Sequence, residues 1–286
     1  MTLEESKFAG GVAVITGAGS GIGAGLARRA GEVGMTVVVT DINAAAAESV
    51  AEEIRAAGGK AEAMVVDVSQ PAELDRLAEA VFAKHGSVRL LVNNAGIETL
   101  GFAWEIPAER WEATLNINLH GVIHGVRAFV PRMLASGEEC WIGNLASVGS
   151  FGMMPTQSAY MVTKHAVQSF SECLYLEMEL KKAPIHVASI IPGMMKTNIF
   201  NADRGAGEPV DGAGYRKTMH DMMAAYGMDL AEGCKVIMAG IAANNFWVSS
   251  QPEMTQQMLA GRIAFFSEQA TPTLNEQTKQ LLGVAD

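Results

Sequence analysis

The sequence contains few cysteines and no long apolar run. Its 286 residues include three cysteines, Cys140, Cys173 and Cys234, which are far apart in the chain and odd in number. This spacing argues against a disulfide framework or a cysteine-based metal site. No apolar stretch approaches the ~18 residues of a membrane-spanning helix, and the acidic N-terminal segment lacks the features of a secretory signal. We therefore expect a cytoplasmic protein without membrane association.

Positive charge is scarce as well. The chain has 21 Lys and Arg against 31 Asp and Glu, a net charge of −10, and no basic cluster offsets it, so we expect no nucleic-acid partner. Hydrophobic residues make up 49% and charged residues 18%, which excludes a disordered chain and indicates a large buried core. His120 and His124 could reach one metal ion, but no third ligand has a suitable spacing, so we predict no metal site.

Short apolar runs alternate with longer Ala- and Glu-rich stretches along the first 190 residues. Runs without internal alternation are typical of parallel strands that are covered on both faces, and the Ala- and Glu-rich stretches favour helix. The pattern therefore predicts an α/β fold, a Rossmann-like doubly wound parallel sheet. The predicted strands are 12–16, 36–40, 63–66, 90–92, 141–144 and 185–191.

The chain shows no internal repeat and no Pro- or Ser-rich linker. Its one compositional break is 201–214, with four glycines and one proline in fourteen residues. A loop of that length inside a compact domain is usually functional. We therefore predict a single domain over 1–286, with a mobile substrate lid at about 194–228 and a C-terminal extension at about 251–286.

A glycine-rich turn follows the first predicted strand and opens a helix. Glycines allow the backbone to turn sharply and to approach a pyrophosphate, whose charge then meets the helix N-terminus. Many strand-to-helix corners also need glycine, but this context favours dinucleotide binding. The candidate residues are Gly17, Gly19, Ser20, Gly21, Ile22 and Gly23.

Asp41 ends the second predicted strand, where this fold places the acid that binds a ribose 2′-hydroxyl. The alternative is a helix cap or a surface acid, and Asn43 could serve as the cap instead. A site for NADP would need a cation to meet the 2′-phosphate, but the neighbours of Asp41 are Thr40 and Ile42. We therefore predict NAD as the cofactor, with NADP less favoured.

Polar residues also follow the third and fourth predicted strands. Asp67 and Val68 could contact adenine, and Asn94, Ala95 and Gly96 belong to an Asn-Asn-Ala-Gly turn. Ligands of open α/β sheets bind outside the carboxyl ends of the strands. A purely structural turn explains the spacing equally well.

Tyr160 and Lys164 are four positions apart in a predicted helix and so share one face. A free tyrosine has a pKa of ~10 and is a poor base at neutral pH. A neighbouring ammonium favours the phenolate, which predicts a lowered pKa and a general acid–base role. By itself such a pair more often marks a helix surface.

Two further polar residues are candidates for the same chemistry. Ser147 follows the fifth predicted strand and could donate to a carbonyl oxygen, although turns also use serine. Asn118 stands in a predicted helix despite its poor helix propensity, which suggests a polar role, and Asn116 competes for that role.

Taken together, these motifs resemble the short-chain dehydrogenase/reductase family, in its single-domain branch. The similarity covers about residues 8–200, and the glycine spacing argues against the epimerases and dehydratases of the extended branch. The resemblance rests on motifs that occur in the order of the family: Thr-Gly-x-x-x-Gly-x-Gly at 16–23, Asn-Asn-Ala-Gly at 93–96, Asn118, Ser147, Tyr160 and Lys164. Placement alone suggests Phe246–Val248 as a seventh strand.

The resemblance implies roles for individual residues. Tyr160 would be the acid/base, Lys164 would lower its pKa and bind the nicotinamide ribose, Ser147 would polarise the carbonyl, and Asn118 would hold a water in a proton relay. Pro192, Gly193 and Thr197 would lie at the nicotinamide. It also implies a homo-oligomer, a dimer or tetramer, and the helices near 111–134 and 159–180 are apolar around much of their circumference.

The sequence thus predicts an NAD(H)-dependent oxidoreductase that interconverts a secondary alcohol and its ketone. Methionine adapts to irregular apolar ligands, and the suspected lid is rich in it, so we expect a small molecule that is bulky, uncharged and cyclic or aryl. A hydroxy acid, a sugar or an acyl-thioester ketone is the alternative within the family, and a non-catalytic nucleotide-binding module is the alternative outside it. The candidate substrate residues are Ser147, Phe151, Met153, Met154, Tyr160, Met194, Met195 and Phe200.

Overall fold

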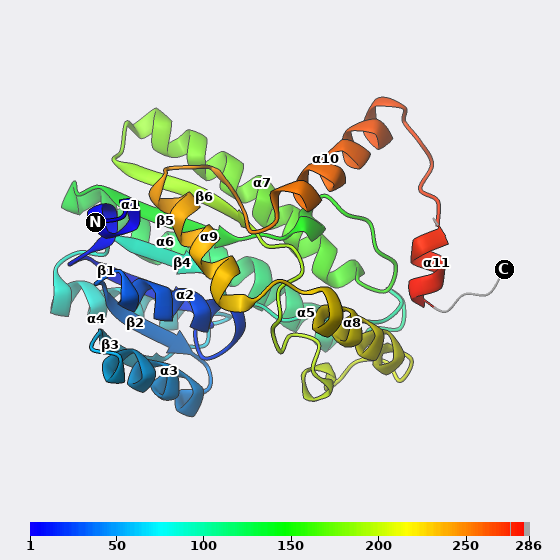
Figure 1. Cartoon of the computed structure of the whole chain (residues 1–286), viewed down its shortest axis with the longest axis horizontal. Helices are drawn as coiled ribbons and strands as arrows, with labels where there is room; N and C mark the ends of the chain where they lie inside the picture. Colours follow the sequence, from blue (N-terminus) through cyan, green and yellow to red (C-terminus); the bar gives the residue numbers. More distant parts are fainter. Residues whose placement is uncertain (275, 283–286) are drawn as a thin grey trace.

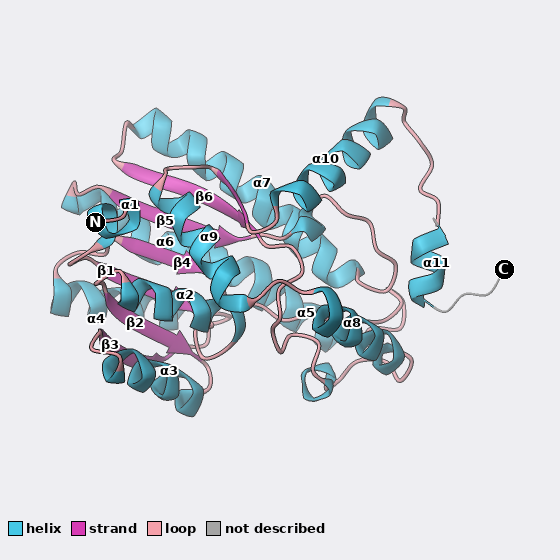
Figure 2. Ribbon diagram, in the orientation of Figure 1, coloured by secondary structure: helices cyan, strands magenta, loops and turns pink. Residues whose placement is uncertain are grey.

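The computed structural model describes residues 1–274 and 276–282 of the chain. Its centre is a parallel sheet of seven strands in the order β3-β2-β1-β4-β5-β6-β7 (Figures 1 and 2). The predicted doubly wound sheet is therefore confirmed. The strands are β1 (Val12–Thr16), β2 (Thr36–Asp41), β3 (Lys60–Val65), β4 (Leu90–Asn93), β5 (Cys140–Leu145), β6 (Ile185–Ile191) and β7 (Trp247–Ser249).

Helices cover both faces of the sheet, and each face has its own apolar core. On one face α2 (Gly21–Glu32), α3 (Ala44–Ala56) and α9 (Leu230–Ala242) pack against the sheet, with Phe8 of α1 (Leu3–Phe8). On the other face lie α4 (Pro71–His85), α6 (Gly121–Ser136) and α7 (Ser158–Lys181). The central strands β1, β4 and β5 are buried throughout, as expected for strands covered on both sides.

The edge strand β3 differs most from its prediction. The apolar run predicted a strand at 63–66, whereas β3 starts at Lys60 and ends at Val65. None of its residues is fully buried, and Lys60 and Val65 are exposed. An edge strand carries polar residues that an apolar-run signal does not include. The seventh strand lies one residue after its predicted start, at Trp247–Ser249.

The segment predicted as a lid leaves and rejoins the sheet domain at one point. Met195 and Met228 form a parallel bridge, and the Met228 N–H donates to Met194 O at 2.9 Å. Between them are the 3₁₀ turn η3 (Ala202–Gly205) and α8 (Gly212–Tyr226). The helix α8 therefore begins inside the stretch 201–214 that the sequence predicted as a loop.

The remaining elements lie around the carboxyl ends of the strands. They are α5 (Ala108–Leu115), the π-helical turn η1 (Asn116–His120), the 3₁₀ turn η2 (Val148–Ser150), α10 (Pro252–Ser267) and α11 (Glu276–Leu282). The helices α10 and α11 project from the body of the molecule (Figure 1). Within the described residues no helix is both long and apolar enough to cross a membrane.

Candidate active site

A cavity of about 600 Å³ lies at the carboxyl ends of the strands. Its cofactor half is lined by most of the residues that the sequence predicted for dinucleotide binding. These are Gly17, Ser20, Gly21, Ile22, Asp41, Ile42, Asp67, Val68, Asn94, Ala95, Gly96, Pro192, Gly193 and Thr197, together with Tyr160 and Lys164. Gly19 and Gly23 belong to the same turn but are not among the residues that line the cavity.

The glycine turn is packed so closely that a side chain would not fit at two of its glycines. Gly17 has φ of +63°, and a Cβ there would lie 2.7 Å from Ala95 Cα. A Cβ on Gly23 would lie 2.4 Å from Gly17 O. The backbone of Ala95 fills the Cβ position of Gly17, and Gly17 O together with the Asn94 side chain fills that of Gly23, so the turn before α2 is tight. Such a cradle fits the pyrophosphate of a dinucleotide.

The Asp41 carboxylate is fixed by two backbone amides. Gly19 N donates to Oδ2 and Asn43 N donates to Oδ1, each at 2.9 Å. Asn43 itself caps α3, since its side chain accepts from Ala46 N at 3.1 Å, so the cap does not depend on Asp41. Asp41 lines the cavity beside the glycine turn, which fits a ribose-binding acid.

Asn94 joins the first and fourth strands below the cavity. Its Nδ2 donates to Thr16 O at 2.7 Å and to Gly17 O at 3.2 Å. Thr16 Oγ1 accepts in return from Asn94 N and Ala95 N. Because strands β1 and β4 are neighbours, these bonds hold the glycine turn against the Asn-Asn-Ala-Gly turn.

Ser147, Tyr160 and Lys164 meet in the middle of the cavity. Ser147 ends the loop after β5, is 7% exposed, and accepts from Gly149 N at 3.0 Å. Lys164 Nζ lies 5.5 Å from the centroid of the Tyr160 ring and donates to Leu145 O at 2.7 Å. All three side chains line the cavity. The end of β5, the loop after it and α7 therefore bring these side chains to the same part of the site.

The pKa of Tyr160 differs from the prediction. Burial, together with the carboxyl of Glu98, raises the pKa of Tyr160, and the Ser147 hydroxyl opposes this rise. Burial lowers the pKa of Lys164 to about 8, against the opposing effect of Glu98. The prediction that Lys164 lowers the pKa of Tyr160 is therefore wrong. Burial of the phenol raises this pKa by more than the Lys164 ammonium could lower it.

Asn118 is fully buried in the π-helical turn η1 and does not line the cavity. Its Oδ1 accepts from Ile97 N and its Nδ2 donates to Ile97 O, both at 2.8 Å. Nδ2 also donates to Thr163 Oγ1 on α7 at 3.2 Å. Asn118 thus connects the segment after β4 to the helix that carries Tyr160, and its role in a proton relay stays a prediction.

The substrate half of the cavity is rich in methionine. The predicted residues Met153, Met154, Met194, Met195 and Phe200 line it, but Phe151 packs beside Trp247 instead, with 5.6 Å between ring centroids. The helix α8 adds Met219 and Met223. The helix α10 adds Met254 and Met258, which the sequence did not predict because they come from the C-terminal extension.

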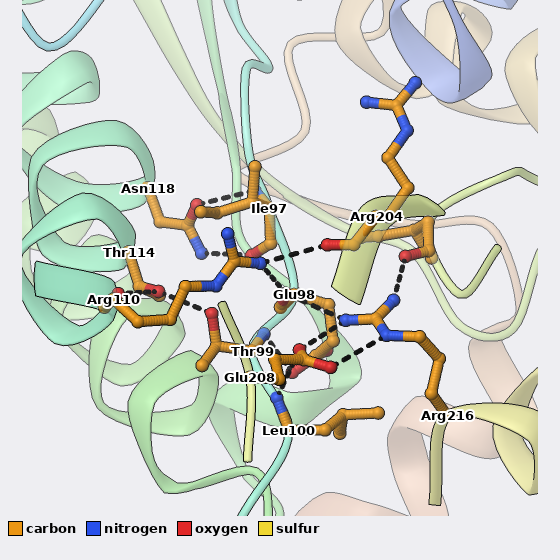
Figure 3. Close-up of polar contacts among 11 residues, drawn as sticks. Ile97, Glu98, Thr99, Leu100, Arg110, Thr114, Asn118, Arg204, Glu208 and Arg216 are labelled. Carbon is orange, nitrogen blue, oxygen red and sulfur yellow. Dashed lines mark hydrogen bonds and ion pairs between the residues drawn. The ribbon is translucent and has the colours of Figure 1, made fainter. Parts of the chain in front are cut away.

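Sequence reasoning also missed a polar cluster beside the lid (Figure 3). Arg216 is 3% exposed and pairs with Glu208 through Nε at 2.9 Å and Nη2 at 2.5 Å. Glu208 Oε1 also accepts from Leu100 N at 2.7 Å. Arg110 donates through Nη2 to the carbonyls of Glu98 and Arg204. The lid cation Arg216 is therefore a structural residue, while Glu98, Arg110 and Arg204 line the cavity.

Comparison with known proteins agrees with this geometry. The short chain dehydrogenase family model matches residues 11–206. The probable oxidoreductase EphD of Mycobacterium tuberculosis is 38% identical over 223 residues, 75% of this chain and 37% of that protein. The chain thus spans little more than a third of the length of that relative. Cyclohexanol dehydrogenase of an Acinetobacter species is 36% identical over 199 residues, 69% of this chain and 78% of that protein.

A solved structure is similar over nearly the whole chain. It is a short-chain dehydrogenase/reductase from Burkholderia phymatum in complex with NAD, with a TM-score of 0.89 and 31% identity, covering 94% of this chain and 98% of that one. The fold and the site define a dinucleotide-binding α/β protein with a serine, a tyrosine and a lysine at its cleft. The chain belongs to the short-chain dehydrogenase/reductase family.

Proposed function

We propose that this protein is an NAD(H)-dependent oxidoreductase that interconverts a bulky, apolar secondary alcohol and its ketone. One observation carries the proposal: Ser147, Tyr160 and Lys164 line a single cavity with the glycine turn and Asp41. A non-catalytic nucleotide-binding module would need none of the three, and all are present at the point where the cofactor half meets the substrate half.

The residues divide the chemistry among themselves. The cofactor, when bound, supplies or accepts the hydride. The Ser147 hydroxyl donates a hydrogen bond to the substrate oxygen and orients it. Tyr160, whose raised pKa keeps it protonated at neutral pH, gives its proton to the oxygen during ketone reduction. In the reverse direction the phenolate form of Tyr160, which has first lost its own proton, takes the proton of the alcohol. Lys164 holds positive charge beside the tyrosine ring.

The preference for NAD rests on Asp41. Its carboxylate accepts two backbone bonds and keeps further lone pairs toward the cavity. A ribose diol can donate to such a group, whereas the 2′-phosphate of NADP would meet a like charge. The residue after Asp41 that lines the cavity is Ile42. It carries no positive charge that could offset the repulsion between Asp41 and a 2′-phosphate.

The substrate class rests on the lining. Nine methionines line the cavity: Met153, Met154, Met161, Met194, Met195, Met219, Met223, Met254 and Met258. Thioether side chains adapt to apolar ligands of irregular shape, which supports a cyclic or aryl alcohol. The similarity to cyclohexanol dehydrogenase supports the same class.

A hydroxy acid is the second candidate, because Arg110 and Arg204 line the cavity. Arg110 already donates to two carbonyls, and its Nε is buried without a partner among the described residues. The side chain of Arg204 points away from Arg110 and Arg216 (Figure 3). The two guanidinium groups therefore do not converge on one carboxylate, which makes this candidate weaker.

Assembly and location belong to the proposal as well. Val162, Leu176 and Leu180 are exposed on one face of α7, at 51%, 62% and 83%, which supports pairing of α7 with a second copy of the chain. A cytoplasmic location agrees with the three free cysteines, Cys140, Cys173 and Cys234. Light scattering that gives a monomer at micromolar concentration would contradict the predicted dimer or tetramer.

The proposed function is tested by following NADH absorbance with a panel of alcohols. The panel contains cyclohexanol, 1-phenylethanol, lactate, 3-hydroxybutyrate and glucose, each with NAD and with NADP. We expect the highest kcat/KM with NAD and a cyclic or aryl alcohol. Preference for a hydroxy acid or a sugar would refute the apolar substrate class. NADH binding without oxidation of any alcohol would favour the non-catalytic module.

A further inference from the structure

Glu98 places a carboxyl group in the substrate half of the cavity. The residue follows the Asn-Asn-Ala-Gly turn, is 3% exposed and lines the cavity with Tyr160 and Lys164. Its backbone carbonyl accepts from Arg110 Nη2 at 3.0 Å and from Arg216 Nη2 at 3.2 Å (Figure 3). Asn118 clamps the preceding residue, Ile97, on both sides of its peptide. The position of Glu98 is therefore fixed by three other elements.

The side chain of Glu98 has little use in the fold. Its Oε1 accepts from Thr99 N at 3.2 Å, and among the described residues its Oε2 has no hydrogen-bond partner. The Arg216 guanidinium gives its hydrogen bonds to Glu208 and to the carbonyls of Ile199 and Glu98. Because Glu98 lines the cavity, an oxygen without a partner in the fold is available to a molecule bound there.

The charge environment favours the neutral acid. Burial, reinforced by Glu208, raises the pKa of Glu98 well above its usual range, although Arg216, the Thr99 amide and Lys164 oppose the rise. Tyr160 and Lys164 on α7, Arg216 on α8, Glu208 before it and Arg110 on α5 are the titratable or charged groups around it. A protonated carboxyl has an O–H donor as well as an acceptor.

We propose that Glu98 is a specificity-determining residue that hydrogen-bonds a second oxygen of the substrate, away from the reacting carbon. The inference rests on the proposed function and narrows it. The preferred substrate is then a bulky apolar alcohol with one further hydroxyl or carbonyl group, and not a plain hydrocarbon alcohol. A polar group that a bound substrate would cover discriminates against an analogue that lacks the matching group, because it would then be left unpaired.

Matched alcohols test the inference. The probes are cyclohexanol and the 1,2-, 1,3- and 1,4-cyclohexanediols, oxidised with NAD by the unmodified enzyme and by Glu98→Leu and Glu98→Gln. We expect the unmodified enzyme to prefer at least one diol by about tenfold in kcat/KM. Leu should abolish this preference. Gln, which is neutral and can also donate and accept, should keep most of it.

The control is Glu105→Gln, which changes an exposed glutamate seven residues further along the same segment and outside the cavity. It should leave the diol preference unchanged. Equal use of cyclohexanol and every diol by the unmodified enzyme would overturn the inference. A diol preference that survives in Glu98→Leu would also overturn it. So would a preference that Glu98→Gln removes as fully as Glu98→Leu, because that result would mean that a charged carboxylate is required.

A binding measurement separates this inference from the proposed function. The measurement uses the Tyr160→Phe background, in which ketone reduction is slow. There NADH fluorescence reports the affinity of the enzyme–NADH complex for cyclohexanone and for 4-hydroxycyclohexanone, and NADH binding itself reports that each variant is folded. Tighter binding of the hydroxyketone, lost in Glu98→Leu, would support the role of Glu98 even if no alcohol in the panel were oxidised. Equal affinities, or binding of neither ketone, would overturn it.

Discussion

The cofactor half and the substrate half of the cavity are built in different ways. The cofactor half consists mainly of short turns that directly follow strands β1, β2, β3, β4 and β6, so most of its residues are fixed by the sheet itself. The substrate half combines segments that are far apart in sequence: the stretch after Asn94–Gly96, the loop before Tyr160, the lid and α10. A long-range polar cluster around Glu208 and Arg216 holds two of those segments together.

The cofactor half therefore has a geometry set by the strands, whereas the lining of the substrate half depends on longer segments. A strand-end turn can only move with its strand, whereas the segment between Met195 and Met228, the predicted lid, leaves and rejoins the sheet domain at one bridge. Function on α/β folds is carried by such loops on a rigid scaffold. We therefore expect changes in the cofactor half to alter binding of the dinucleotide, and changes in the substrate half to alter which alcohol is used.

The largest effect is expected where the halves meet. Tyr160→Phe removes the hydroxyl that transfers the proton, so kcat should fall by about 10²- to 10⁴-fold. The dissociation constant of NADH, measured by fluorescence, should change little because the ring remains in place. Wild-type turnover in this variant would show that another group transfers the proton.

The next effect concerns the lid. Glu208→Ala leaves the Arg216 guanidinium buried without its partner, which should lower the free energy of unfolding by about 3 kcal/mol. Replacing both residues by methionine removes the buried charge as well and should restore most of that loss. Urea denaturation measures both variants. If the single variant were as stable as the double one, the ion pair would not hold the lid.

A pair of glycines sharpens the contrast between the halves. Gly23→Ala places a Cβ against Gly17 O and should cost about 1–3 kcal/mol by overpacking, with weaker NADH binding. Gly214→Ala is the control: it lies in α8, and a Cβ there would meet nothing within 4 Å. Better helix propensity should make this variant more stable, by up to about 1 kcal/mol. Equal effects on NADH affinity would contradict the division into halves.

The smallest effect is expected on cofactor choice. The unmodified enzyme should use NAD with a higher kcat/KM than NADP, and Asp41→Ala should narrow that ratio by about tenfold, because the like charge that opposes the 2′-phosphate is removed. Both values come from initial rates with one alcohol. An enzyme that favours NADP before any substitution would refute the assignment to Asp41.

The same contrast explains how much the sequence could predict. Strands buried on both faces and the turns that follow them leave local signals, so β1, β2, β4, β5 and β6 and the glycine turn were found. The edge strand β3 and the start of α8 were misplaced, because Lys60 and Glu62 interrupt the apolar pattern and glycines at 212 and 214 obscure a helix. The buried hydrogen bond between Arg216 in α8 and Glu208 before it holds the start of this helix in place.

Three features of the site had no local signal. Met254 and Met258 reach the cavity only through the placement of α10 after β7. The raised pKa of Tyr160 depends on burial and on Glu98, which precedes it by 62 positions in the chain. Phe151 was assigned to the cavity by its position between Ser147 and Tyr160, but it packs beside Trp247. Glu98 alone could have been noticed, as an acid inside an apolar stretch that follows the Asn-Asn-Ala-Gly turn.

Hydride transfer itself is the most direct test of the central claim. Cyclohexanol carrying deuterium on the carbon that bears the hydroxyl is oxidised with NAD, and the NADH formed is analysed by mass spectrometry. The proposed reaction predicts that the unmodified enzyme forms NADH carrying one deuterium. The Tyr160→Phe variant should form this deuterated NADH only at the rate of its residual turnover. NADH that forms without deuterium, or an enzyme that binds NAD and cyclohexanol and forms no NADH, would contradict the account.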